Sequence, residues 1–134
     1  MKAKKLLDSY ALLAYLNKEK NFQKIKKVLS EAQSSGFPLL MNEINIGETY
    51  YILYRKRSQE KAEFFLDTVL PGLSITVLSN SFEDIMAAAR IKAEYPLSFA
   101  DCFAAATARR ENAIVLTGDP EFRKIAHMVT IDWL

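Results

Sequence analysis

Four acidic residues stand far apart in the sequence at positions where their carboxylates could act together: Asp8, Glu48, Asp101 and Asp119. Asp8 and Asp119 each follow a short apolar stretch, whereas Glu48 and Asp101 lie near the starts of segments with helical spacing. Sites built only of oxygen ligands suit hard cations such as Mg²⁺ or Mn²⁺, which commonly activate water for phosphate chemistry. We therefore expect a divalent-metal site if the fold brings these four acids together.

Three of the four acids also have a simpler explanation as helix caps. Asp is a favoured N-cap residue, and Asp119 is followed by Pro120, which is typical of a first helical position. Taken singly, Asp8 and Asp119 are better explained as caps. Asp101 stands three residues after Ser98, in a sequence that approximates a capping box. Its helix is otherwise apolar, however, and a carboxylate packed there would be costly without a partner.

Glu48 is the acid that capping does not explain. It lies in the second turn of its predicted helix, too deep for a cap, and spacings of three and four residues place it with Ile44, Tyr51 and Ile52. We interpret this stripe as the core-facing side of the helix, so that the carboxylate points inward. A partly buried acid needs a cation, a hydrogen-bond network or a proton, and this requirement favours a metal site.

The elements that would position these acids alternate along the chain. Short apolar strands are expected at 5–7, 38–41, 74–78 and 113–116, with a fifth at 128–131. Helices are expected between them, including one from the Asn42 cap to about Arg57, one from Ser58 through Val69, 82–94 and 98–112, and a last short one after Asp119. This alternation predicts a single α/β domain over 1–134, with a parallel sheet covered on both faces. Because sites in such sheets form beyond the carboxyl ends of the strands, Asp8 and Asp119 should share an edge.

The composition excludes several other chemistries. Cys102 is the only cysteine, so there is no internal disulfide and no zinc site of several cysteines. His127 is the only histidine, and we interpret it as a surface or packing residue. No glycine-rich phosphate-binding motif occurs, and no apolar run approaches the roughly 20 residues of a membrane span. One cysteine and no export signal indicate a cytoplasmic protein.

Charge is unevenly distributed, although the formal net charge is only +2. Residues 1–30 contain eight Lys against two acids, a net of +6, whereas the remainder has a net of −4. This basic first part could bind a phosphate backbone, with Lys18, Lys20 and Arg55 as candidates at the rim of the site. A solvated helix face explains the same pattern equally well.

Four stretches of this sequence resemble the PIN-domain family, in particular the stand-alone VapC-type toxin ribonucleases. They are LLDSYALLAYL, MNEINIGETYYIL, LSFADCFAAATARRENAIVLTGDPEF and the terminal IDWL. The resemblance covers essentially the whole chain and is strongest over 97–122. It implies a three-layer α/β/α sandwich with strand order 3-2-1-4-5, and an endoribonuclease that uses Mg²⁺ or Mn²⁺.

The same resemblance assigns roles to individual residues. The family's acids correspond to Asp8, Glu48, Asp101 and Asp119, with Asp8 and Asp101 expected as direct metal ligands and the other two completing the shell directly or through water. Ser9 and Thr117 would support them. Asn42 and Cys102 depart from the residues frequent at their positions, Ser and Ala, and neither is a ligand in the family's pattern.

The implied partners are RNA as substrate, a small antitoxin protein and a second copy of the chain in a homodimer. Apolar contacts could come from Tyr50, Tyr51, Tyr54 and the Phe64-Phe65 pair, for which ordinary core packing is an equally good explanation. The alternative function is a catalytically silent PIN-like module that binds RNA or protein. A phosphorylated receiver-type domain is disfavoured, because it would need a Lys ending the last core strand, where the chain has AIVLTGD.

Overall fold

The computed structural model describes residues 3–134, which build one five-stranded parallel sheet. The strands are β1 (Lys5–Leu7), β2 (Leu39–Asn42), β3 (Ile75–Leu78), β4 (Ile114–Thr117) and β5 (Ile131–Trp133). Their order is β3-β2-β1-β4-β5, and each neighbouring pair is parallel. The predicted α/β/α class and the order 3-2-1-4-5 are therefore confirmed.

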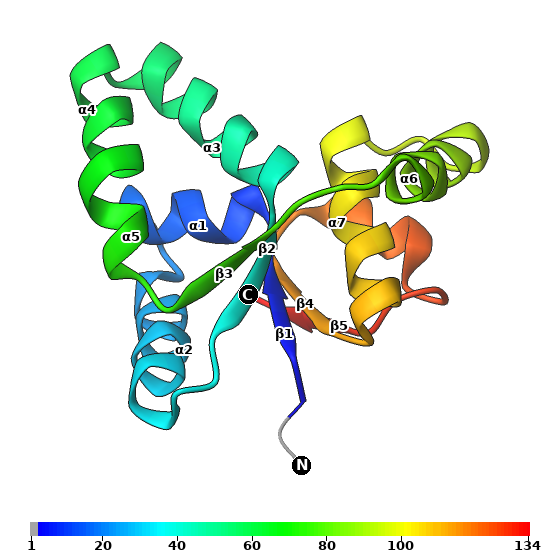
Figure 1. Ribbon diagram of the computed structural model, residues 1–134, viewed down its shortest axis with the longest axis horizontal. Coiled ribbons are helices and arrows are strands. Elements are labelled where there is room, and N and C mark those ends of the chain that lie inside the picture. Colours follow the sequence, from blue (N-terminus) through cyan, green and yellow to red (C-terminus); the bar gives the residue numbers. More distant parts are fainter. Residues whose placement is uncertain (1–2) are drawn as a thin grey trace.

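Helices connect the strands and cover both faces of the sheet (Figure 1). In chain order they are α1 (Ser9–Leu16), α2 (Phe22–Ser35), α3 (Glu43–Lys56), α4 (Gln59–Phe64), the π-helical segment Phe65–Val69, α5 (Leu70–Gly72), α6 (Phe82–Glu94), α7 (Phe99–Glu111) and the 3₁₀ helix Pro120–Ile125. In Figure 1, helices α1 to α5 lie on one side of the sheet and α6 and α7 on the other. No helix within residues 3–134 is long and apolar enough to cross a membrane.

Alternating strand residues build two separate cores. Leu7, Leu39, Met41 and Leu116 pack with α1, α2 and α3 in one buried cluster. Leu6 and Val115 face the other way and pack with α6, α7 and the 3₁₀ helix. Successive side chains of a strand point to opposite faces, so the three residues of β1 contribute to both cores. Asp8 directly follows the last of them, at the carboxyl end of the strand.

The fifth strand differs from its predicted position. It was expected at 128–131, but the structure places it at Ile131–Trp133. Its register is set by pairing with β4, where Val115, Leu116 and Thr117 face residues 131–133. Val129 is instead buried against the α6–α7 side. The apolar composition of 128–131 identified a segment that packs in the core. Backbone pairing with β4 instead makes residues 131–133 the strand.

Two helices also differ in type from the prediction. The helix expected from Ser58 through Val69 is α-helical only to Phe64 and then widens into a π-helical segment. The last short helix is a 3₁₀ helix, capped as predicted by Asp119 with Pro120 at its start. Asn42 caps α3 as expected, since its side chain accepts a hydrogen bond from the Ile44 N–H at 2.9 Å.

Candidate active site

Asp8 lies at the carboxyl end of β1 and is completely buried. Its Oδ1 accepts a hydrogen bond from the Ala11 N–H at 2.9 Å, which makes it the cap of α1, and its Oδ2 accepts one from the Thr117 hydroxyl. Burial raises the pKa of this carboxyl to about 7, against the lowering effect of the two hydrogen bonds, and the charges of Asp119 and Glu48 raise it further. Capping uses one oxygen and leaves a desolvated carboxylate that a cation would stabilise.

Thr117 ends β4 and connects two of the acids. Its hydroxyl donates to Asp8 and accepts a hydrogen bond from the Asp119 N–H at 3.0 Å. Asp119 in turn caps the 3₁₀ helix, its Oδ1 accepting from the Glu121 N–H at 3.0 Å. The β1–β4 pairing brings these residues together, because it places Leu7 opposite Leu116 and so aligns the two strand ends.

We expect Thr117→Val to weaken both the site and the fold. The buried Thr117 hydroxyl is bonded on both sides, so its loss leaves the Asp119 N–H and one oxygen of Asp8 without a partner. Each buried polar group left in this way costs about 1–3 kcal/mol, and loss of a residue that orients a metal ligand typically costs about 10–100-fold in activity or metal affinity. Chemical unfolding and metal titration measure the two effects, with Thr117→Ser as the control that keeps the hydroxyl. Wild-type values in both assays for Thr117→Val would contradict this role.

Asp101 lies in the first turn of α7, where its side chain is only 5% exposed. Ser98 caps the helix by accepting from the Asp101 N–H at 3.2 Å. Unlike the capping box of α6, where Asp84 reaches back to the Ser81 N–H at 2.8 Å, no hydrogen bond from the Ser98 N–H to Asp101 occurs in the described chain. The Asp101 carboxyl therefore has no capping role.

The surroundings of the Asp101 carboxyl disfavour its charged form. Burial is the main cause that raises its pKa, to about 8, followed by the adjacent carboxyl of Asp119 and by the charges of Asp8 and Glu48. Asp8 and Asp101 therefore both lie within electrostatic reach of Glu48 and Asp119.

Glu48 also lies at this site, with Asp101 and Asp119, but on a different face of α3 than predicted. The buried face of α3 carries Asn45, Ile46, Thr49 and Leu53, whereas Ile44 and Tyr51 are 40% and 47% exposed. The interpretation of the Ile44–Tyr51 stripe as core-facing was therefore wrong. Glu48 lies beside the core face and is half-buried, where its carboxylate accepts a hydrogen bond from the Ser9 hydroxyl.

None of the salt bridges within residues 3–134 includes Asp8, Glu48, Asp101 or Asp119, so no basic side chain in this part of the chain forms an ion pair with the four acids. Over the same residues, no three side chains of the types that usually bind metals are close enough to enclose an ion by themselves. The donor set nevertheless fits a hard divalent cation, because the two most buried carboxylates, Asp8 and Asp101, lack a counter-charge and Mg²⁺ is commonly bound by one or two carboxylates and several waters. Asp8 and Asp101 would hold such an ion, with Glu48 and Asp119 acting beside them or through water.

Three of the four acids, Glu48, Asp101 and Asp119, line a depression of about 340 Å³, whereas the completely buried Asp8 lies beneath the surface and is not part of this lining. The rest of the lining consists of Glu121, the serines Ser9 and Ser98, and the side chains of Tyr10, Leu13 and Ile52. No Lys or Arg within residues 3–134 lines it. Lys18 instead lines a separate groove between α1 and α4, so the structure does not place it at the rim of the acidic site.

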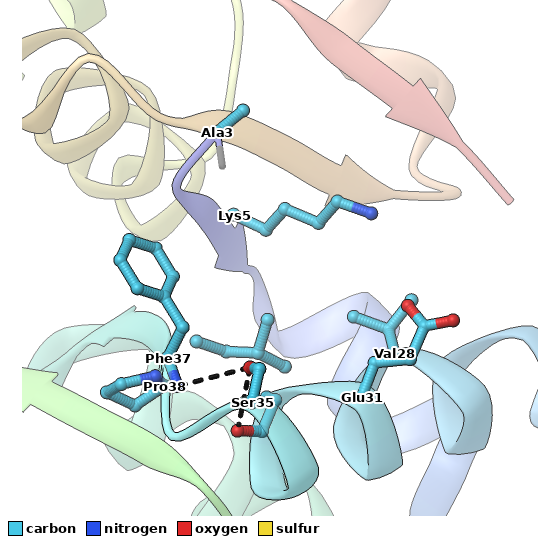
Figure 2. A pocket seen from close by; sticks show the side chains of 9 residues that line it. Ala3, Lys5, Val28, Glu31, Ser35, Phe37 and Pro38 are labelled. Atoms are coloured by element: carbon cyan, nitrogen blue, oxygen red, sulfur yellow. Dashed lines mark hydrogen bonds between the residues drawn. The ribbon is translucent and has the colours of Figure 1, made fainter. Parts of the chain in front are cut away.

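A hollow at the opposite edge of the sheet has a different chemistry. It measures about 230 Å³ and lies among the start of β1, the end of α2 and the residues before β2 (Figure 2). Among the described residues that line it, Glu31 is the single acid, and the Ser35 hydroxyl there donates to the Ala32 carbonyl at 3.3 Å and accepts from the Phe37 N–H at 3.2 Å. The described lining of this hollow thus differs from the depression at the carboxyl-terminal edge, which contains several carboxylates.

Two residues at the site were missed by sequence reasoning. Tyr10 lines the depression and directly follows Asp8 and Ser9, so its position in the first turn of α1 was the available signal. Asn45 is completely buried in α3, and its amide donates to the Ala100 carbonyl at 3.1 Å, next to Asp101. Its position one turn before Glu48 was visible, but contact with α7 was not.

Comparison with known proteins identifies the fold family. The PIN domain family model matches residues 5–128, so the chain belongs to the PIN domain family. Among curated proteins, none matches the sequence significantly.

Solved structures with the same fold cover nearly the whole chain. VapBC2 from Rickettsia felis, bound to a DNA fragment from its promoter, matches with TM-score 0.75 and 16% identity over 96% of each chain. VapC20 from Mycobacterium tuberculosis, a Sarcin-Ricin loop cleaving toxin, matches with TM-score 0.75 and 17% identity, covering 94% of this chain and 97% of that one. DNA-bound VapBC from Salmonella typhimurium matches with TM-score 0.75 and 19% identity over 98% of each chain. The predicted resemblance to the PIN family and its VapC-type members is confirmed at the level of the fold.

Proposed function

We propose that the protein is a metal-dependent endoribonuclease of the VapC type that hydrolyses RNA phosphodiester bonds. The observation that carries the proposal is the pair of buried carboxylates, Asp8 and Asp101, which share one edge of the sheet without any basic partner. Membership of the PIN domain family and the likeness to VapC20, a toxin that cleaves the Sarcin-Ricin loop, support this choice of chemistry.

The four acids and the two hydroxyls would have different roles in the reaction. A bound Mg²⁺ or Mn²⁺ would supply Lewis-acid stabilisation of the phosphate and lower the pKa of an attacking water. Asp8 and Asp101 would hold the cation, and Glu48 and Asp119 would orient water at the open side of the depression. Thr117 fixes Asp8 relative to Asp119, and Ser9 fixes the carboxylate of Glu48. Both hydroxyls act on carboxylates, which is how supporting groups keep ligands in a productive orientation.

The test is cleavage of total RNA by the purified protein with Mn²⁺ or Mg²⁺, followed by mapping of the new RNA ends. We expect cleavage that stops when EDTA removes the metal and resumes when Mn²⁺ is restored. Binding of Mn²⁺ with no cleavage of any RNA in the mixture would contradict the nuclease and favour the silent binding module. Mapping also identifies the RNA that is cut.

We further propose that the protein is the toxin of a toxin–antitoxin pair in the cytoplasm. A solved toxin–antitoxin complex from Klebsiella pneumoniae contains a chain with this fold (TM-score 0.65, 15% identity over 96% of each chain), which supports a small antitoxin as partner. A groove of about 370 Å³ offers a surface for such a protein, with Leu16, Leu53 and Val69 in its lining and Lys18, Arg57 and Lys61 around them. Both Phe64 and Phe65 line this groove; Phe64 is 59% exposed, whereas Phe65 is buried, in line with the core packing that was the alternative explanation for this pair.

Two measurements test these assemblies. Co-expression with the product of an adjacent small open reading frame should give a complex that purifies together and lacks ribonuclease activity. Light scattering of the protein alone should give the mass of a homodimer, with Tyr51 and Tyr54, 47% and 43% exposed, as candidates for the contact. A free, active protein in the first experiment or a monomer in the second would contradict the corresponding partner.

A further inference from the structure

Tyr10 is an exposed aromatic side chain at the edge of the acidic depression. It follows the buried Asp8 and Ser9 at the start of α1, and it is 42% exposed. It shares the lining of the depression with Glu48, Asp101 and Asp119. Exposed aromatic residues beside a nucleic-acid site commonly serve as surfaces on which bases stack.

The Tyr10 ring lies directly against Gly118. A Cβ atom added at Gly118 would lie 2.4 Å from Cε1 of Tyr10, closer than Cβ atoms approach other atoms, and would make tight contacts of 3.1 Å with Cδ1 and Cζ. Gly118 has no positive φ, so its backbone does not require glycine. The Tyr10 ring occupies the space that a side chain at position 118 would fill, so a larger residue there would displace the ring. The ring thus lies against the backbone segment that also carries Thr117 and Asp119.

The lining of the depression also contains aliphatic side chains. Leu13, one turn further along α1 from Tyr10, and Ile52 of α3 line it, and both are half-buried. The depression therefore combines carboxylates that suit a metal-bridged phosphate with aromatic and aliphatic side chains that suit a planar, uncharged group. In a strand of RNA, the planar group nearest to a phosphate is the adjoining nucleobase.

We infer that Tyr10, whose ring lies against Gly118, is the surface on which a nucleobase next to the scissile phosphate stacks. This inference rests on the proposed ribonuclease activity and adds the residue that positions the RNA strand. Stacking is tolerant of base identity, because every base has a π-face. The ring would thus orient single-stranded RNA without specifying its sequence.

The first test combines Tyr10→Ala with abasic RNA. Short single-stranded oligoribonucleotides containing the mapped cleavage point are made with one abasic nucleotide at each flanking position in turn. We expect Tyr10→Ala to lower kcat/KM on intact RNA by roughly 5- to 150-fold, which corresponds to loss of one base–aromatic stack. At one flanking position, the abasic substitution should lower wild-type kcat/KM by a similar factor and leave Tyr10→Ala unaffected. Tyr10→Phe, which keeps the ring, should retain wild-type kcat/KM on all these substrates.

The second test uses the contact with Gly118. Gly118→Ala places a methyl group where the ring lies, and the exposed ring can turn away into solvent. We therefore expect Gly118→Ala to reduce kcat/KM about as much as Tyr10→Ala does. In the Tyr10→Ala background, where the space is vacant, Gly118→Ala should have no further effect.

Each outcome has a definite meaning. Equal loss by Tyr10→Ala on intact and abasic RNA at every position would overturn the inference, because it would show a purely structural role. Unchanged cleavage by Tyr10→Ala, including the case in which only binding of a partner protein is weakened, would overturn it as well. A wild-type protein that cuts no RNA would contradict the proposed function itself, which keeps the two failures distinguishable.

Discussion

Asp101→Asn should reduce metal-dependent RNA cleavage by at least about 100-fold, since stabilisation of charge that develops in a transition state is commonly worth 10²- to 10³-fold per group. The substitution keeps the shape of the side chain and removes its negative charge. Asp101 is the strongest candidate, because it is 5% exposed, caps nothing and lies beside Asp119. Asp8→Asn should have an effect of the same order, although Asp8 also caps α1, because Asn can accept the same hydrogen bond.

The control for this experiment is Asp67→Asn. Asp67 is exposed in the π-helical segment Phe65–Val69, away from the residues that line the depression. The same change from carboxylate to amide there should leave cleavage unchanged, which excludes an effect of net charge alone. Activity of Asp101→Asn or Asp8→Asn within a few-fold of the wild type would contradict the proposed mechanism.

The second large effect concerns stability without metal. Burial raises the folded-state pKa of Asp8 to about 7 from an ordinary value of 3.8, so folding favours the protonated carboxyl. A group with a raised folded pKa contributes most below its unfolded pKa, and this contribution is lost as the pH rises through the folded value. In EDTA, the free energy of unfolding should therefore contain an Asp8 contribution that falls between about pH 4 and pH 7. Asp101, whose pKa is also raised, should act in the same direction.

Asp8→Asn isolates this contribution. An amide does not ionise in this range, so the variant should gain stability relative to the wild type as the pH rises, by about 1–3 kcal/mol between pH 5 and pH 8 after allowance for relaxation. Urea unfolding in EDTA at the two pH values measures the difference. A constant difference between variant and wild type at both pH values would show that Asp8 is not desolvated in the folded protein.

Bound metal should restore the stability that the wild type loses at high pH, and it should do so more strongly than in Asp8→Asn. Ligand carboxylates must be deprotonated to bind a cation, and binding to the folded state stabilises it by mass action. Mn²⁺ at pH 8 should therefore raise the wild-type unfolding midpoint more than that of Asp8→Asn. We therefore expect Asp8→Asn to remove activity and, at high pH, to stabilise the metal-free fold. Such a trade-off is common where buried charges serve function.

The sequence by itself determined the elements and the places of the four acids along them. Short apolar strands alternating with amphipathic helices predicted a parallel sheet, and hydrogen-bonding side chains at Asp8, Asn42 and Asp119 marked helix starts that the structure confirms. Because the strands run parallel, Asp8 and Thr117 had to end at the same edge. These features are local, or follow from strand direction, and they can be deduced without contacts.

The tertiary structure decided which face of each element is buried and which residues meet. Periodicity gave the spacing of α3 correctly but not its orientation, because contacts with α1 and α7 bury Asn45 and Thr49 rather than Ile44 and Tyr51. Pairing with β4 selected Ile131–Trp133 as the last strand, although 128–131 is equally apolar. The packing of Tyr10 against Gly118 joins residues 108 positions apart, and only the folded chain shows why that position is glycine. Buried faces, strand register and close contacts depend on side chains distant in sequence, which no local pattern records.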